Sequence, residues 1–297
     1  VIDAASGSRK YLMNVGEVSN RGVELSVNTK QIVNKKGFNW SSSFMYSSNS
    51  NRVEQLADSS LVLQQRSVGS GQLVAFEGGS MGALYGLGYQ RAPDGQVIYD
   101  AATGYAKITE EVLPLGNTIP KGKASIGNTF TYKAWRLNVL FDAQWGAVAH
   151  SLTHYKLAEQ GKIKSTLPGR YSGIIGNGVI QNEDGTFRKN DVIATNVDEY
   201  YRSHYGSDNA EGSTFSTNFI KFREARLDYT LPKHMLSSLG LNKASVGVYG
   251  RNLFIWSAWP AFDPEFGTLD GSDIVKGFEI AQFPSTRTFG FNIIVGF

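Results

Sequence analysis

Two histidines, His150 and His154, are four residues apart, a spacing that can place two metal ligands on one face of a helix. A hydrolase built on this motif also needs an acidic general base, and no acidic residue fills that position. Both histidines follow a predicted strand and fall in a long loop. We therefore interpret them as ordinary loop histidines, and His204 and His234 as isolated structural or solvated residues.

The acidic residues Asp263, Glu265 and Asp270 are a second candidate for chemistry. Two carboxylates catalyse glycoside hydrolysis when a cleft holds them at a fixed separation, and nothing in the sequence indicates such a cleft. Asp263 and Glu265 flank Pro264, and an aspartate next to a proline is more typical of a turn than of a cation site. The sequence favours neither a hydrolase nor a metal site here.

Composition excludes further classes of site. The glycine-rich stretch Gly78–Gly88 lacks the Lys-Ser/Thr pair of a phosphate loop and the helix of a dinucleotide fold. The chain has no cysteine, which excludes disulfides, cysteine-ligated zinc and iron–sulfur sites. Its net charge of +3 is dispersed, so no nucleic-acid partner is predicted. We expect no cofactor and no enzyme activity.

Aromatic residues in two predicted loops are expected to be exposed and are candidates for binding. Flat rings can stack on sugars or pack against a protein partner, and the alternative is packing within the loops themselves. The candidates for substrate or partner contact are Trp256, Trp259, Phe262, Phe266, Tyr200, Tyr201 and Tyr205.

The elements that must position these residues do not resemble membrane helices. Hydrophobic residues make up 41% of the 297 positions, yet no apolar run approaches the roughly 18 residues that a membrane helix needs. Transmembrane β-strands escape this test, because they alternate apolar and polar residues. The first ten residues, VIDAASGSRK, resemble neither a signal peptide nor a translated start, so we expect part of a longer polypeptide.

Period-two alternation is the dominant pattern, and it is clearest at the end of the chain. In a membrane barrel the bulky face of such a strand points to lipid. We expect this segment to be the C-terminal strand used in barrel assembly. Its bulky positions are Phe289, Phe291, Ile293, Val295 and Phe297.

Charged and amide side chains alternate with apolar ones in two other segments. Such a face is costly in a closed core but suits a water-filled lumen. The candidate inward residues are Arg136, Asp142, Gln144, Arg226 and Asp228.

About seven strands are predicted in this way, which indicates an all-β, antiparallel transmembrane barrel portion with long extracellular loops. Short turns on one side and long loops on the other are typical of outer-membrane barrels. The hairpin signals Asp94-Gly95 and Asp184-Gly185 predict that the long loops are folded. The expected turns are Asn34–Gly37, Lys133–Ala134 and the moderate Pro232–Lys243, and the expected long loops span about 57–122, 148–215 and 257–284.

Four segments, in this order along the chain, resemble the SusC/RagA family of TonB-dependent transporters from Bacteroidota. The last of them resembles the closing strand with its terminal aromatic residue. The segments are NVGEVSNRGVEL (Asn14–Leu25), LGNTIPKGKASIGNTFTYKAWRLNVLFDAQWG (Leu115–Gly146), YGRNLFIWSAWPAFDPEFG (Tyr249–Gly267) and PSTRTFGFNIIVGF (Pro284–Phe297).

The resemblance implies an outer-membrane, multi-pass barrel of about 22 strands with a plugged lumen, of which residues 1–297 form the C-terminal part. The plug domain, the TonB-contacting segment and the earlier strands lie outside this sequence. It also implies import of glycans or peptides with a SusD-like surface lipoprotein, energised by TonB through the upstream region. Barrel-assembly machinery and outer-membrane lipid are further expected partners, and the inward residues above are expected to contact the plug rather than substrate.

Two other functions remain alternatives. A self-contained surface adhesin, or β-sandwich carbohydrate-binding module, would need the bulky strand faces to be buried in protein. An outer-membrane hydrolase barrel would need a nucleophile and a base, which the sequence does not indicate.

Overall fold

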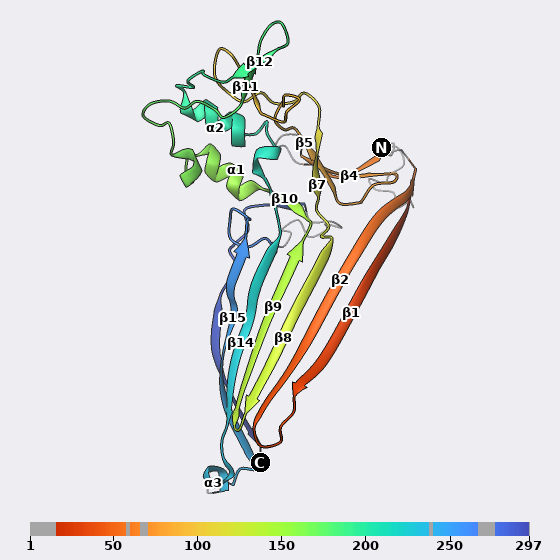
Figure 1. Cartoon of the computed structure of the whole chain (residues 1–297), viewed down its shortest axis with the longest axis vertical. Coiled ribbons are helices and arrows are strands. Elements are labelled where there is room, and N and C mark those ends of the chain that lie inside the picture. The colour runs from red at the N-terminus through yellow and green to blue at the C-terminus, as the bar shows by residue number, and fades with distance from the viewer. Residues whose placement is uncertain (1–15, 58–59, 66–70, 238–239, 267–276, 297) are drawn as a thin grey trace, which may run out of the picture.

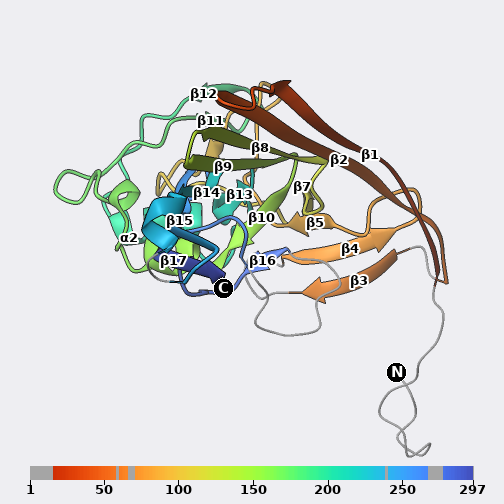
Figure 2. The ribbon, with the colours of Figure 1, turned by 90° about the horizontal axis from the view of Figure 1, so that it is seen from below.

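The computed structural model of the chain describes residues 16–57, 60–65, 71–237, 240–266 and 277–296. Seven strands form one antiparallel sheet in the order β1-β2-β8-β9-β14-β15-β17 (Figure 1), which confirms the seven predicted strands. Seen from below, these strands follow an open arc (Figure 2). Their bounds are Gly16–Ile32 (β1), Phe38–Leu56 (β2), Gly122–Tyr132 (β8), Trp135–Trp145 (β9), Phe219–Thr230 (β14), Lys243–Ser257 (β15) and Thr288–Gly296 (β17).

The connections differ in length at the two ends of the sheet, as predicted. The β8–β9 turn consists of Lys133 and Ala134, and Lys133 adopts a φ of 53° to reverse the chain in two residues. The short helix α3 (Lys233–Leu236) lies at the same end, between β14 and β15 (Figure 1). All three long connections emerge at the opposite end.

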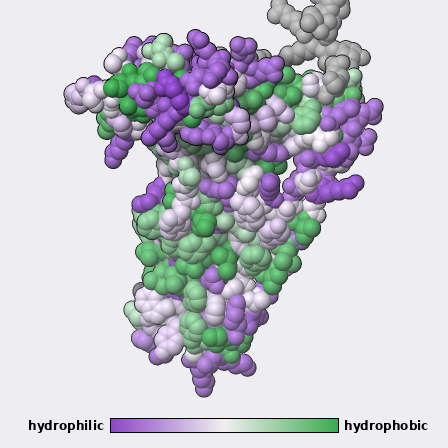
Figure 3. Space-filling model, turned by 45° about the horizontal axis from the view of Figure 1, so that its top comes forward, coloured by the Kyte–Doolittle hydropathy of each residue, from purple (hydrophilic) through white to green (hydrophobic). Residues whose placement is uncertain are grey.

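The register of the strands produces one apolar face. A single row across six strands consists of Val27, Phe44, Ile126, Phe141, Phe222 and Phe254. Phe291 and Ile293 of β17 continue this face and are 78% and 64% exposed, so the described residues leave it uncovered. Figure 3 shows hydrophobic residues over the body of the sheet and hydrophilic ones over the loops. The sandwich alternative requires such side chains to be buried, and here they are not.

The other face of the sheet is polar. In the strand register, Arg136 lies opposite Asp228 in one row, and Arg226 lies opposite Asn138 in the next. The row of Asp228 continues through Gly247, where an added Cβ would lie 2.1 Å from the Asp228 carboxylate. A larger residue at position 247 would require the Asp228 carboxylate to move. The residues predicted from alternation to share a polar face therefore do so, and their position inside a lumen stays a prediction.

The long connections fold together into a second body, which we call the cap (residues 60–65, 71–117, 148–216, 258–266 and 277–287). It contains helices α1 (Leu152–Glu159) and α2 (Val197–Tyr205), with 3-10 turns at Lys164–Thr166 and Glu211–Ser213. Its strands are Ser60–Gln65 (β3), Gln72–Phe76 (β4), Ala83–Gly86 (β5), Ile98–Tyr99 (β6), Leu113–Asn117 (β7), Val148–Ser151 (β10), Val179–Gln181 (β11), Phe187–Lys189 (β12), Thr214–Ser216 (β13) and Phe278–Glu279 (β16).

Contacts between connections hold the cap together. Strand β6 of the first connection pairs with β11 of the second, and β10 of the second pairs with β16 of the third. The Glu279 carboxylate accepts hydrogen bonds from the Ser151 hydroxyl at 2.8 Å and the Thr153 N–H at 3.0 Å, at the start of α1. The prediction that the long loops are folded is confirmed, and Gly95 and Gly185 adopt the positive φ of their turns. Within the described ranges, no helix has the length and apolar character needed to cross a membrane.

Candidate functional site

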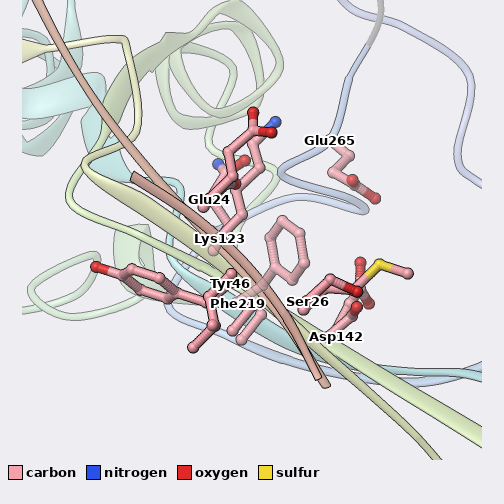
Figure 4. Close-up of a pocket in the computed structure, with 14 residues that line it drawn as sticks. Glu24, Ser26, Tyr46, Lys123, Asp142, Phe219 and Glu265 are labelled. Atoms are coloured by element: carbon pink, nitrogen blue, oxygen red, sulfur yellow. The ribbon is translucent and has the colours of Figure 1, made fainter. Parts of the chain in front are cut away.

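Two hollows lie where the polar face of the sheet meets the cap. The first has a volume of about 580 Å³ and the second about 510 Å³, and both are lined by Lys123, Gln144 and Glu265. In Figure 4, Glu265 approaches from the last long connection, above the strands that carry Glu24, Ser26 and Asp142. The hollows are therefore bounded by the sheet on one side and by residues 258–266, here called the strap, on the other.

A network of charges joins the strap to the sheet. The Lys221 ammonium of β14 donates to Asp263 at 2.6 Å and to Glu265 at 2.5 Å. The Arg223 guanidinium donates to Asp142 of β9 at 2.8 Å and also to Glu265. Three segments distant in sequence thus meet at five charged side chains, and the Lys221 side chain is only 3% exposed. Sequence analysis did not identify Lys221 or Arg223.

The carboxylates of this network are suited to ion pairing rather than to acid catalysis. Burial alone would raise the pKa of Asp263 and Glu265, but hydrogen bonds from Lys221, and for Glu265 also from Arg223, lower both pKa values below their ordinary values. The general acid of a glycosidase needs a raised pKa instead. This arrangement does not support the hydrolase alternative, and Asp270 lies outside the described residues.

Three histidines are held within the cap, two of them buried and His204 partly buried. His150 lies in β10, His154 in α1 and His204 in α2, and each ring has a hydrogen-bonding contact to Ala210, Ser213 or Tyr89, respectively. No group of three or more His, Cys, Asp and Glu side chains that could hold a metal occurs among the residues placed by the structure. Burial lowers the pKa of His150, His154 and His204 to about 4.

These histidines predict a pH dependence for the cap. Their folded pKa lies below the ordinary value of 6.5, so the unfolded cap binds more protons between pH 6.5 and about 4. We therefore expect hydrogen-exchange protection of α1 and α2, corrected for intrinsic rates, to decrease as the pH falls through this range. Replacement of the exposed His234 by Gln should leave the profile unchanged. An unchanged protection of α1 and α2 between pH 6.5 and 4 would contradict the assignment.

The structure corrects the expected exposure of several aromatic candidates. Tyr200 and Tyr201 are buried in α2, and Tyr205 is half-buried. Trp259 and Phe266 are buried against each other, with ring centroids 5.5 Å apart. The expectation that these rings face solvent is wrong for the four buried ones, whose surroundings favour the alternative of packing within the loops.

Two aromatic candidates are exposed. Trp256, predicted to lie in a loop, belongs to strand β15, which is a second correction. Its ring stacks on Phe254 and extends the apolar face. Phe262 lies exposed in the strap. A contact of any of these aromatic residues with substrate or a partner stays a prediction.

The remaining predicted residues lie on the expected faces. Asp142 and Gln144 are on the polar face and line the first hollow, together with Phe219. Arg136, Arg226 and Asp228 lie on the same face, farther from the cap. Phe289, Phe291, Ile293 and Val295 share the apolar face of β17, and Phe297 lies outside the described residues. Their contacts with a plug or with assembly machinery stay predictions.

Comparison with known proteins confirms the resemblance found in the sequence. No protein-family model matches the chain. The chain is 22% identical to TonB-dependent receptor P3 of Formosa agariphila, over 96% of its own length and 29% of the receptor. It is 25% identical to TonB-dependent receptor P26 of the same organism, over 100% of its own length and 31% of the receptor. The chain thus spans about 30% of the length of these relatives.

Solved structures have the same fold. The RagAB peptide transporter superposes with a TM-score of 0.68 and 19% identity, over 99% of this chain and 31% of that one. The RagAB peptide importer in its "open-open" state gives a TM-score of 0.64, with 16% identity over 100% of this chain and 30% of that one. The fold is therefore that of a partial antiparallel barrel. The relatives are receptors and transporters rather than enzymes, in agreement with the prediction from sequence.

Proposed function

We propose that this chain forms the C-terminal wall and external loops of an outer-membrane TonB-dependent transporter, which imports glycans or peptides together with a SusD-like surface lipoprotein. The observation that carries the proposal is the two-sided sheet. One face is predominantly apolar and uncovered, the opposite face is charged, and a folded cap stands at one end. A lipid-facing barrel wall around a wet lumen requires this arrangement.

The two edges of the sheet support incorporation into a larger barrel. Strands β1 and β17 each pair with only one neighbour among the described strands. In hydrocarbon, unpaired backbone groups cost several kcal/mol each, so both edges require partner strands. The relatives, which are about three times as long, have room for such strands and for a plug domain and TonB contact upstream.

Within this function, the hollows beside the strap are the proposed ligand-contacting part of the chain. They lie at the cap end of the polar face, where a solute captured outside would enter the lumen. The similarity to proteins named peptide transporters favours peptides, whereas the family resemblance also includes glycans. The exposed Phe262 is the aromatic candidate best placed to contact a ligand or the lipoprotein.

The mass of the native polypeptide and the identity of its co-purifying chains test the proposal. The polypeptide that carries this sequence should be purified from outer membranes in mild detergent and then boiled and sized. We expect a mass roughly three times the 32.5 kDa of this chain, with a co-purifying surface lipoprotein. A single species of 32.5 kDa, without a partner chain, would contradict the proposal and favour a small barrel or binding module.

A further inference from the structure

We propose that Lys221 fastens the strap onto the barrel wall, and that undocking of the strap joins the two hollows into one passage beneath the cap. The structural part concerns only the strap and β14. The consequence for ligand passage rests on the proposed transport function.

The position of Lys221 makes it the main anchor. Its side chain extends from the polar face of β14, is almost wholly buried, and pairs with both carboxylates of the strap. The ammonium also lies 4.7 Å from the centroid of the Phe219 ring. Buried charges persist only when paired, and removing one partner leaves the others uncompensated. Loss of Lys221 would therefore leave Asp263 buried without its cation.

Arg223 provides a second, weaker attachment. It bridges Asp142 of β9 and Glu265 of the strap, and its side chain is more exposed than that of Lys221. A bulge between Phe222 and Glu224 changes the register of β14 at this point. Both cations thus form ion pairs with carboxylates of the strap, and Arg223 also links the strap to β9.

Two features raise the free energy of the docked strap. The Trp259 indole N–H is buried and has no hydrogen-bond acceptor among the described residues, which costs about 1–3 kcal/mol. Phe262 has a φ of 55°, a conformation that bulky residues rarely adopt. The stacked pair of Trp259 and Phe266 offsets part of this cost. Docking of the strap therefore depends on the ion pairs. Because these two unfavourable features oppose the ion pairs, the strap is suited to opening.

Release of the strap would change the shape of the ligand-contacting region. Glu265 lines both hollows, and Pro264 and Phe266 line the second one. Lys123 and Gln144, which also line both, belong to the sheet and would remain in place. Undocking would thus remove the strap residues from the lining of both hollows and leave the strand residues in place. Lys221 is in this sense a positioning residue for access to the lumen.

Hydrogen exchange in the full-length polypeptide, reconstituted in detergent, tests the fastening directly. In Lys221→Met we expect amides of residues 258–266 to exchange about tenfold faster or more, because the largely buried Asp263 loses its cation and Glu265 keeps only Arg223. Lys221→Arg should largely restore protection. The control is Arg251→Gln, which removes a cross-strand ion pair with Glu224 on the same polar face, away from the strap, and should change nothing there.

The outcomes separate the structural claim from the functional one. Unchanged exchange of the strap in folded Lys221→Met would overturn the proposal. If Lys221→Met does not fold, Glu265→Gln weakens the same pairs from a partly exposed position, and unchanged exchange there would overturn it equally. Faster exchange with an unaltered uptake rate would retain the fastening and reject its role in passage. Failure of the proposed transport function itself would instead appear as no uptake by the unmodified protein.

Discussion

Replacement of Phe291 by Arg is expected to prevent stable membrane insertion of the barrel that contains this chain. Phe291 is 78% exposed on the apolar face, and its row continues through Val248, Leu227 and Leu137. An arginine on the lipid face of a barrel costs about 2–4 kcal/mol near the bilayer midplane. We therefore expect a large fall in the heat-modifiable, folded fraction recovered from outer membranes.

Ile294→Arg is the matched control for this experiment. Ile294 lies in the same strand and is also apolar and exposed, but it pairs with Ser245 on the polar face. A charge there enters the wet lumen, so assembly should be nearly normal. Equal recovery of Phe291→Arg and Ile294→Arg would show that β17 does not face lipid, and the membrane assignment of the sheet would have to be abandoned.

The sheet was predictable because its signals are local. Period-two alternation depends only on neighbouring residues, and a sheet with one apolar and one polar face produces it. The two-residue turn at Lys133–Ala134 then sets the register of β8 and β9. Once these strands are paired, the faces of Arg136 and Asp142 follow without further information.

The candidate site was less predictable because it depends on contacts between distant segments. Asp263 and Glu265 were recognised as charged, but their partners lie about 40 residues earlier, in β14. Alternation of Lys221 with Ile220 and Phe222 was a usable signal for an inward cation. The bulge next to Arg223 interrupts that pattern, and no local feature indicates which loop the cation meets.

The same reason explains the errors in exposure. Tyr200 and Trp259 fall in segments without strand periodicity, and aromatic residues in loops suggest a binding surface. In the structure they form the cores of the cap, since rings from different connections pack together. The local sequence shows the amphipathic pattern of α2, but it does not show which residues of other segments cover this helix.

Replacement of Tyr200 by Ala is expected to open the cap rather than to weaken ligand contact alone. Tyr200 is 6% exposed and lies in a core with Tyr99 and Ala106 of the first connection and Ile180 of the second. Truncation of a buried aromatic ring costs about 3–5 kcal/mol. Because this core joins two connections, hydrogen exchange should increase in α2 and also in residues 98–106, although the latter lie about 100 positions away.

Tyr171→Ala provides the comparison, because Tyr171 belongs to the same connection as Tyr200 and is fully exposed. It should leave exchange unchanged throughout the cap. If Tyr200→Ala reduced ligand binding while residues 98–106 kept their protection, the ring would act as a contact residue, as first expected from the sequence. Increased exchange in both connections, with strands β8 and β9 still protected, would establish the cap as a body that unfolds separately from the barrel wall.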